Sequence, residues 1–338
     1  MLIQDAISHV IERQDLSRDQ MQSVMQQIMT GQSTDSQIGG LLVALRMKGE
    51  SVDEITAAAE VMASLASHVD IDTTNLIDIV GTGGDGISTF NVSTAASFVA
   101  AGAGCSVAKH GNRSVSSKSG SADLLEQAGA NLSLEPSQVA NVIESAGVGF
   151  MFAPMHHSAM RHAIGPRKEM AIRTIFNVLG PLTNPAKVKR QVIGVFAKEL
   201  TEVLAKVFMH LGSDHALVVH SDDGMDEISI CAPTTISEMK NGLVKSYTVS
   251  PEDFGLQTQS VETIVVANPS ESLALIDRVL MGEKGAARDI VVLNAGAGIY
   301  VSGLADSLES GVELAKVSLD SGKALGAKQA YVAATQSV

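Results

Sequence analysis

The fold is decided by residues 76–86, which read Leu-Ile-Asp-Ile-Val-Gly-Thr-Gly-Gly-Asp-Gly. The mostly apolar start predicts a buried strand, and the loop after it has four glycines within six positions. Glycine has no Cβ, so such a loop lets the backbone approach a ligand closely. A helix is expected to begin near Asn91, Ser93 and Thr94, which turns its free N–H groups and the positive end of its dipole toward the loop. This strand, loop and helix predict a site for an anion.

A second loop of similar character spans residues 109–121 and follows the short apolar stretch 105–108. It carries Lys109, Arg113 and Lys118 among small hydroxyl-bearing residues, and therefore offers cations and hydrogen-bond donors without bulk. Neither loop has the spacing of the Walker motif or of the dinucleotide-binding glycine motif. Two anion-binding loops that converge indicate a polyphosphate ligand.

Several segments have distinctive patterns: Gly-Thr-Gly-Gly-Asp at 81–85, Asn-Val-Ser-Thr at 91–94, Lys-His-Gly-Asn-Arg at 109–113 with 117–123, the run that starts Arg-Thr-Ile-Phe-Asn at 173–185, and Gly-Met-Asp-Glu-Ile-Ser at 224–229. Taken in order, they resemble the signatures of the anthranilate phosphoribosyltransferase family. The resemblance implies an enzyme of tryptophan biosynthesis that transfers the phosphoribosyl group of 5-phospho-α-D-ribose 1-diphosphate to the amine of anthranilate.

The length and the hydrophobic patterns predict about two domains. Residues 1–72 have helical periodicity, with capping-box spacings at Ser17/Gln20, Thr34/Gln37 and Ser51/Glu54. From residue 73, short apolar runs alternate with helical ones, which predicts an α/β domain with a mostly parallel central sheet.

The resemblance implies that the segment from about 156 to 185 returns to the helical domain. The expected architecture is then a small discontinuous helical domain, made of 1–72 and about 156–185, and a larger α/β domain made of 73–155 and 186–338. This is the nucleoside phosphorylase/phosphoribosyltransferase type of fold.

The expected strands are 76–80, 106–108, 149–152, 191–196, 215–220, 228–232 and 243–249. The expected helices of the α/β domain are 92–102, 122–127, 136–146, 200–211, 270–279, 286–301 and 307–320. The tight region 228–249 could also include an antiparallel pair.

Composition and charge limit the classes of function. The chain has 24 Lys and Arg against 37 Asp and Glu, a net charge of −13, which disfavours nonspecific binding to nucleic acid or to an anionic membrane. The sequence opens with no signal-peptide pattern and contains no apolar stretch of membrane-spanning length. Cys105 and Cys231 are far apart in sequence and are expected to be reduced thiols. These features predict a cytoplasmic protein.

The resemblance assigns the contacts with the phosphoribosyl diphosphate to the two glycine- and serine-rich loops. The implied residues are Gly81, Gly84, Asp85, Thr89, Asn91, Val92, Ser93, Thr94, Lys109, His110, Gly111, Asn112, Arg113, Ser114, Val115, Ser116, Ser117 and Ser121. Asp85 cannot stabilise a diphosphate directly, so it either orients the loop, or a water on a metal ion, or caps a turn.

The acidic run 222–227 would repel itself unless a cation lay among its carboxylates, and oxygen ligands suit magnesium. A solvated acidic turn is the other interpretation of this run. The resemblance implies two magnesium ions per subunit, with Asp226 and Glu227 as ligands and Ser93 completing one of the two sites.

The resemblance assigns anthranilate to Gly81, Asn112 and Arg167. The planar donor fork of an arginine matches a carboxylate at two points. His110 either accepts a proton, hydrogen-bonds to the anthranilate carboxylate or holds the loop, and no catalytic base is required. Ala171 and Ser158 stand where the family often has glycine and proline.

Two alternatives remain from the sequence. A pyrimidine nucleoside phosphorylase shares the fold and a similar Lys-His-Gly loop, but the Asp226–Glu227 pair and the run 173–185 argue against it. A catalytically silent relative that binds nucleic acid would need a basic cleft and damaged metal motifs, and this acidic chain shows neither. The resemblance also implies a homodimer that forms through the helical domain.

Overall fold

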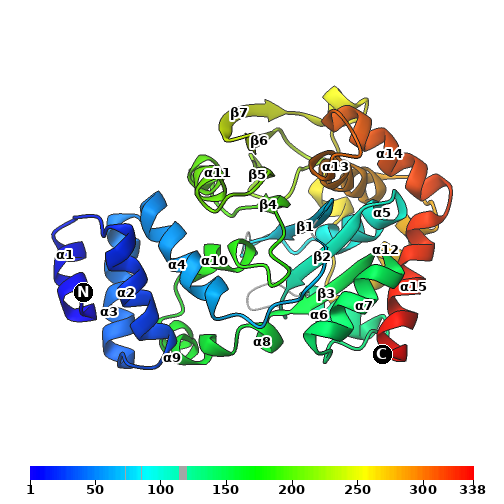
Figure 1. Ribbon diagram of the computed structural model, residues 1–338. Coiled ribbons are helices and arrows are strands. Elements are labelled where there is room, and N and C mark those ends of the chain that lie inside the picture. Colours follow the sequence, from blue (N-terminus) through cyan, green and yellow to red (C-terminus); the bar gives the residue numbers. More distant parts are fainter. Residues whose placement is uncertain (73, 85, 114–119) are drawn as a thin grey trace.

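The computed structural model describes residues 1–338 except 73, 85 and 114–119. A group of helices at the amino-terminal end lies beside a larger region built on a sheet (Figure 1). The described residues form a seven-stranded sheet in the order β3-β2-β1-β4-β5-β6-β7. Its strands are β1 (Leu76–Gly81), β2 (Ser106–Gly111), β3 (Val148–Phe152), β4 (Arg190–Gly194), β5 (His215–Ser221), β6 (Thr234–Lys240) and β7 (Leu243–Val249).

Strands β1 to β5 pair in parallel, and β6 and β7 add an antiparallel edge. The prediction of a mostly parallel sheet is therefore confirmed, as is the antiparallel pair in the region 228–249. The predicted strand at 228–232 is wrong, because Ile228 and Ile230 enter the core as an irregular segment. The Asn294 side chain holds that segment by hydrogen bonds to both the N–H and the carbonyl of Ile228, at 2.9 Å each.

Helices cover both faces of the sheet, because neighbouring residues of a strand point to opposite faces. On one face Val192 and Leu217 join a core with the central helices, and on the other Ile193 and Val218 pack toward α11 and the helical region. The helices of the α/β region are α5 (Val92–Gly102), α6 (Ser121–Gln127), α7 (Pro136–Ala146), α11 (Leu200–His210), α12 (Pro269–Leu280), α13 (Ala286–Ser302), α14 (Leu308–Asp320) and α15 (Lys323–Ser337). All but α15 were expected from the sequence, within one or two residues at each end.

The amino-terminal region consists of α1 (Ile3–Ile11), α2 (Arg18–Met29), α3 (Asp35–Lys48) and α4 (Val52–Ser64). The three predicted capping boxes are present at Ser17, Thr34 and Ser51. No helix among the described residues is both long enough and apolar enough to span a membrane.

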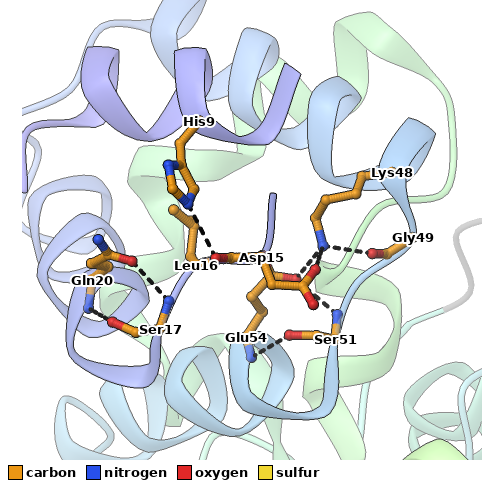
Figure 2. A network of polar contacts seen from close by, with 9 residues as sticks. All are labelled: His9, Asp15, Leu16, Ser17, Gln20, Lys48, Gly49, Ser51 and Glu54. Carbon is orange, nitrogen blue, oxygen red and sulfur yellow. Dashed lines mark hydrogen bonds and ion pairs between the residues drawn. The ribbon is translucent and has the colours of Figure 1, made fainter. Parts of the chain in front are cut away.

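A buried ion pair ties these helices together (Figure 2). Lys48 Nζ lies 2.9 Å from Glu54 Oε2 and 2.5 Å from Asp15 Oδ1, and the Glu54 side chain is fully buried. Glu54 also accepts hydrogen bonds from the backbone N–H groups of Leu16 and Ser51, at 2.9 and 2.8 Å. One carboxylate thus fixes the end of α3, the start of α4 and the link between α1 and α2.

The segment from β3 to β4 holds α8 (Ala153–His156), a 3₁₀ turn (Ser158–Met160), α9 (Arg161–Met170) and α10 (Phe176–Leu182). Its side chains Ala163, Phe176 and Leu179 belong to the same buried apolar cluster as residues of α1 to α4. Backbone hydrogen bonds at both ends of the segment reach the chain after α4, with Ser67 N to His156 O at 2.8 Å and Val69 N to Pro185 O at 3.1 Å.

Candidate active site

The glycine loop after β1 is held by the last residue of β4 and by a residue that follows β5. Thr82 N donates to the Gly194 carbonyl over 2.9 Å, and Gly83 N donates to Asp226 Oδ2 over 2.7 Å. A Cβ on Gly81 would lie 2.3 Å from Asp226 Oδ2, and one on Gly194 would lie 1.5 Å from the Asp226 carbonyl oxygen. The absence of side chains at these two glycines therefore lets the Asp226 carboxylate reach the loop at the carboxyl edge of the parallel strands.

A buried lysine lies beside this carboxylate. Lys109, on β2, donates from Nζ to the Ile79 carbonyl over 2.5 Å and to Ser93 Oγ over 3.1 Å. Burial lowers the pKa of Lys109, and the nearby carboxylates of Asp78, Glu227 and Asp226 oppose that effect. Lys109 on β2, Ser93 at the start of α5 and the carboxylates of Asp226 and Glu227 after β5 are therefore brought together.

The donors in this group suit a hard divalent cation. Ser93, Asp226 and Glu227 offer only oxygen atoms, which is the ligand type that magnesium prefers. Burial raises the pKa of Asp226, so a cation that stabilises its charged form would be bound favourably. No cluster of three or more His, Cys, Asp or Glu suited to a metal occurs among the described residues.

Helix α5 begins directly behind this group, with Val92 and Ser93 in its first turn. Asn91 is locked to α12, because its N–H donates to Ser272 Oγ over 3.0 Å and Ser272 Oγ donates to its Oδ1 over 3.0 Å. Thr94 Oγ1 donates to Ser121 Oγ over 3.1 Å, which joins the start of α5 to the start of α6, and Thr89 forms an isolated bridge to Val265. The predicted residues 89–94 and Ser121 therefore lie around one helix start.

His110 is buried next to Lys109 and is neutral. Its Nδ1 lies 3.1 Å from the Gly180 carbonyl, so Nδ1 carries the proton and Nε2 is left as an acceptor with no partner in the described part of the chain. Burial lowers the pKa of His110 to about 3, and the His157 ring 5.0 Å away contributes in the same direction. An imidazole with this pKa is a weak base at neutral pH.

The remaining residues of the second loop differ in their contacts. Gly111 packs directly on Phe150, whose ring a Cβ would meet at 2.7 Å, and Asn112 is exposed. Arg113 pairs with Asp123 at 3.0 Å and with Glu126 at 2.6 Å, so in this structure it faces α6. The predicted contacts Asp85, Ser114, Val115, Ser116 and Ser117 lie outside the described residues.

Arg167 lies on α9, in the segment between β3 and β4. Its guanidinium is 5.2 Å from the ring centre of Phe176, the first residue of α10, and α10 also carries the carbonyl that binds His110. Burial lowers the pKa of Arg167, yet no carboxylate or carbonyl of the described chain accepts a hydrogen bond from it. A half-buried guanidinium without an anion of its own is suited to bind the carboxylate of a ligand.

Three residues of the site carried no role in the sequence analysis. Asp78 and Asn184 join β1 to the end of β2, and Arg173 contacts the glycine loop at Gly84. The only signals in the sequence were an aspartate inside an apolar strand and an arginine at the head of the run 173–185.

The fold and the site define the class of the protein as a glycosyltransferase with a helical region and an α/β region. Residues 73–325 match the family model "Glycosyl transferase family, a/b domain", and residues 4–66 match "Glycosyl transferase family, helical bundle domain". Within that class the chain belongs to the anthranilate phosphoribosyltransferase family.

This assignment is supported by relatives that align with the chain over nearly its full length. The anthranilate phosphoribosyltransferase of Marinomonas sp. (strain MWYL1) is 60% identical over 326 residues, which cover 96% of this chain and 94% of the relative. The crystal structure of the Thermus thermophilus enzyme superposes with a TM-score of 0.93 at 42% identity, over 98% of this chain and 99% of that one. The Saccharomyces cerevisiae enzyme in complex with PRPP and Mg superposes with a TM-score of 0.91 at 28% identity, over 99% and 98% of the two chains.

Proposed function

We propose that the protein transfers the phosphoribosyl group of 5-phospho-α-D-ribose 1-diphosphate to the amine of anthranilate, giving N-(5-phosphoribosyl)anthranilate and diphosphate. The observation that carries this proposal is the pairing of two unlike sites. At the edge of the sheet, Lys109, the start of α5 and several oxygen ligands lie close together. The second site is formed by Arg167, whose guanidinium has no anionic partner in the described part of the chain. The first suits a diphosphate with its metal, and the second suits the carboxylate of an aromatic acid.

The proposed donor site comprises the two loops and the start of α5. Its residues are Gly81, Gly84, Asp85, Thr89, Asn91, Val92, Ser93, Thr94, Lys109, His110, Gly111, Asn112, Arg113, Ser114, Val115, Ser116, Ser117 and Ser121. We assign two magnesium ions per subunit to Ser93, Asp226 and Glu227, as oxygen ligands that suit this cation. When bound, magnesium neutralises negative charge on the diphosphate.

The chemistry asks for positioning and for charge stabilisation. The amine of anthranilate is neutral at pH 7, so no strong base is required, and the weak base His110 is consistent with that. Departure of diphosphate from C1 of the ribose leaves cationic character on the sugar and negative charge on the leaving group. Lys109 and the N–H groups at the start of α5 stabilise that negative charge. Gly81, Asn112 and Arg167 hold the amine facing C1, which turns a bimolecular attack into a positioned one.

The proposal includes a hinge between the two regions. Residues 1–72 with about 156–185 form the helical domain, and residues 73–155 with 186–338 form the α/β domain. Closure brings Arg167 toward the donor loops and excludes water, which would otherwise capture the cationic sugar. The enzyme acts in the cytoplasm as a homodimer that forms through the helical domain.

The test follows anthranilate fluorescence after mixing the protein with phosphoribosyl diphosphate and magnesium. The signal falls with the wild type and stays constant with EDTA. Arg167→Ala raises KM for anthranilate by about 10- to 100-fold, the value of a lost charged hydrogen bond. The matched control is Arg161→Ala, which removes an exposed guanidinium of the same helix and leaves the kinetics unchanged. No turnover by well-folded wild type rejects the transferase, and a phosphate-plus-nucleoside assay then tests the phosphorylase.

A further inference from the structure

Arg173 links the two regions of the chain at the glycine loop. It lies between α9 and α10, in the segment that packs with the amino-terminal helices. Its Nη2 donates to the Gly84 carbonyl, and its guanidinium lies 4.4 Å from the ring centre of Phe196. Phe196 follows β4, so both partners of Arg173 belong to the α/β region.

The glycine loop needs external support because of its backbone. Gly83 and Gly84 both have positive φ, +67° and +79°, and neither has a side chain that could anchor the turn by packing. Thr82 and Gly83 are held through their N–H groups by residues of the α/β region, as described above. The third contact is from Arg173 to the Gly84 carbonyl. Of these three contacts, it is the one made by the segment that also carries Arg167, the proposed anthranilate-binding residue.

The same short segment carries the proposed acceptor residue. Arg167 and Arg173 are six residues apart in sequence, and each guanidinium packs on an aromatic ring, Phe176 for the first and Phe196 for the second. An exposed arginine is ordinarily solvated, whereas the planar group of Arg173 is oriented by a ring on its face and a carbonyl at its edge. Its position therefore depends on how the acceptor segment is docked.

We propose that Arg173 is a positioning residue that sets the glycine loop for the diphosphate of the donor substrate and couples that loop to the acceptor segment. This inference rests on the proposed function of the site. Arg173 acts through the Gly84 carbonyl and need not touch either substrate. Removing it leaves the loop with its two N–H supports and a free carbonyl, so the loop samples orientations that do not bind diphosphate.

The experiment compares wild type, Arg173→Ala and Arg173→Lys, with Arg161→Ala as an exposed arginine control. Steady-state kinetics give KM for each substrate, and calorimetric titration with inorganic diphosphate and magnesium gives a binding constant that needs no turnover. Arg173→Ala raises KM for phosphoribosyl diphosphate and Kd for diphosphate by about tenfold, and leaves Kd for anthranilate in the free protein unchanged. Arg173→Lys lies between, because an ammonium still donates to the carbonyl but cannot stack as a plane.

A second variant separates positioning from general damage. Phe196→Leu removes the ring that orients Arg173 and keeps an apolar side chain, and it raises the same two constants by about threefold. Unchanged diphosphate affinity in Arg173→Ala with a wild-type unfolding temperature overturns the inference while the transferase stands. A loss confined to anthranilate also overturns it. If the wild type shows no turnover but Arg173→Ala binds diphosphate more weakly than the wild type does, the positioning role is supported and the proposed reaction is rejected.

Discussion

Asn184 donates a hydrogen bond from Nδ2 to Asp78 Oδ2 over 2.8 Å, and the same nitrogen donates to the Ala108 carbonyl over 2.9 Å. These contacts lie where β1 and β2 separate, since their parallel pairing ends at Ile77. The other Asp78 oxygen accepts from the His110 N–H over 3.3 Å. Two buried side chains thus replace the missing strand pairing and hold the end of β2, which carries the site residues, apart from β1.

Asn184→Ala is expected to destabilise the fold by about 2–3 kcal/mol at pH 7.5, because a fully buried carboxylate loses its amide donor. Burial raises the pKa of Asp78 to about 6, above its value in the unfolded chain. Asp78 therefore favours folding most at low pH and loses that contribution as the pH rises through about 6. The amide stabilises the charged form, so the penalty of the variant shrinks at pH 5. Urea unfolding at both pH values measures it.

The control for this prediction is Asn141→Ala, which removes an exposed amide from α7. Its effect is expected to stay within about 0.5 kcal/mol at either pH. A penalty for Asn184→Ala that is equal at pH 5 and pH 7.5 would contradict the role given to the Asp78 charge.

Gly81→Ala is expected to reduce kcat/KM by at least about 100-fold through displacement of one carboxylate. The backbone at Gly81 suits any residue, since its φ is not positive, but the new Cβ would lie 2.3 Å from Asp226 Oδ2. Asp226 must then release the Gly83 N–H and move away from its proposed metal-binding position. Activity measured against magnesium concentration should therefore reach half of its maximum at a higher magnesium concentration than in the wild type.

Gly326→Ala gives the matched control. Gly326 lies inside α15, and a Cβ there meets nothing within 4 Å. This change is expected to stabilise the protein by about 0.5–1 kcal/mol without altering activity, because alanine favours the helix. Full activity in Gly81→Ala would show that Asp226 tolerates displacement.

Local patterns predicted much of the fold. The capping boxes at Ser17, Thr34 and Ser51 and the helix Pro136–Ala146 depend on neighbouring residues, and they formed where the sequence indicated. The edge of the sheet was harder, because Ile228 and Ile230 look like a strand but are fixed from a distance by Asn294. The helix Lys323–Ser337 was missed: much of its surface is polar or small, and it packs through α5 and α7.

The residues of the site also fall into two groups: those that local sequence patterns predicted and those that depend on distant partners. The residues that would touch phosphate lie in contiguous loops with a distinctive composition, so Lys109 and Ser93 could be proposed from the sequence alone. The residues that support those loops are single polar groups whose partners are far away in sequence. Asp78 meets Asn184 across 106 positions, and Arg173 meets Gly84 across 89. No spacing rule reports such pairs, and they become visible only when the strands and segments are placed in space.

Glu238→Gln is expected to make the free energy of unfolding depend less on pH in the acid range. Burial alone would raise the pKa of Glu238, but hydrogen bonds from His215, Tyr300 and Tyr247 outweigh it and lower the pKa to about 2. A lowered pKa contributes stability above the unfolded value, near 4.5, and that stability is lost as the pH falls toward about 2. The contribution is about 2 kcal/mol after a reduction for partial solvation.

Urea unfolding between pH 3 and pH 7 measures this slope. The variant should be less stable than wild type at pH 7, and this difference should be clearly smaller at pH 3. Glu313→Gln serves as the control, because that carboxylate is 68% exposed and pairs with Lys316 only three residues away. Parallel curves for wild type and Glu238→Gln would show that the network does not govern acid stability.

Ala171→Gly is expected to raise stability by about 0.5–1 kcal/mol, which is a rise of about 1–2 °C in Tm for a chain of this size. Ala171 ends α9 with φ +50° and ψ +30°, a left-handed conformation in which a Cβ is unfavourable and glycine is not. Ala333→Gly, in the exposed face of α15, is the opposite control and should cost about 1 kcal/mol. Because Ala171 lies between Arg167 and Arg173, unchanged kinetics in a stabilised Ala171→Gly would show that the strain at this turn is not needed to place the two arginines. A lower Tm would mean that the left-handed turn is not the source of strain.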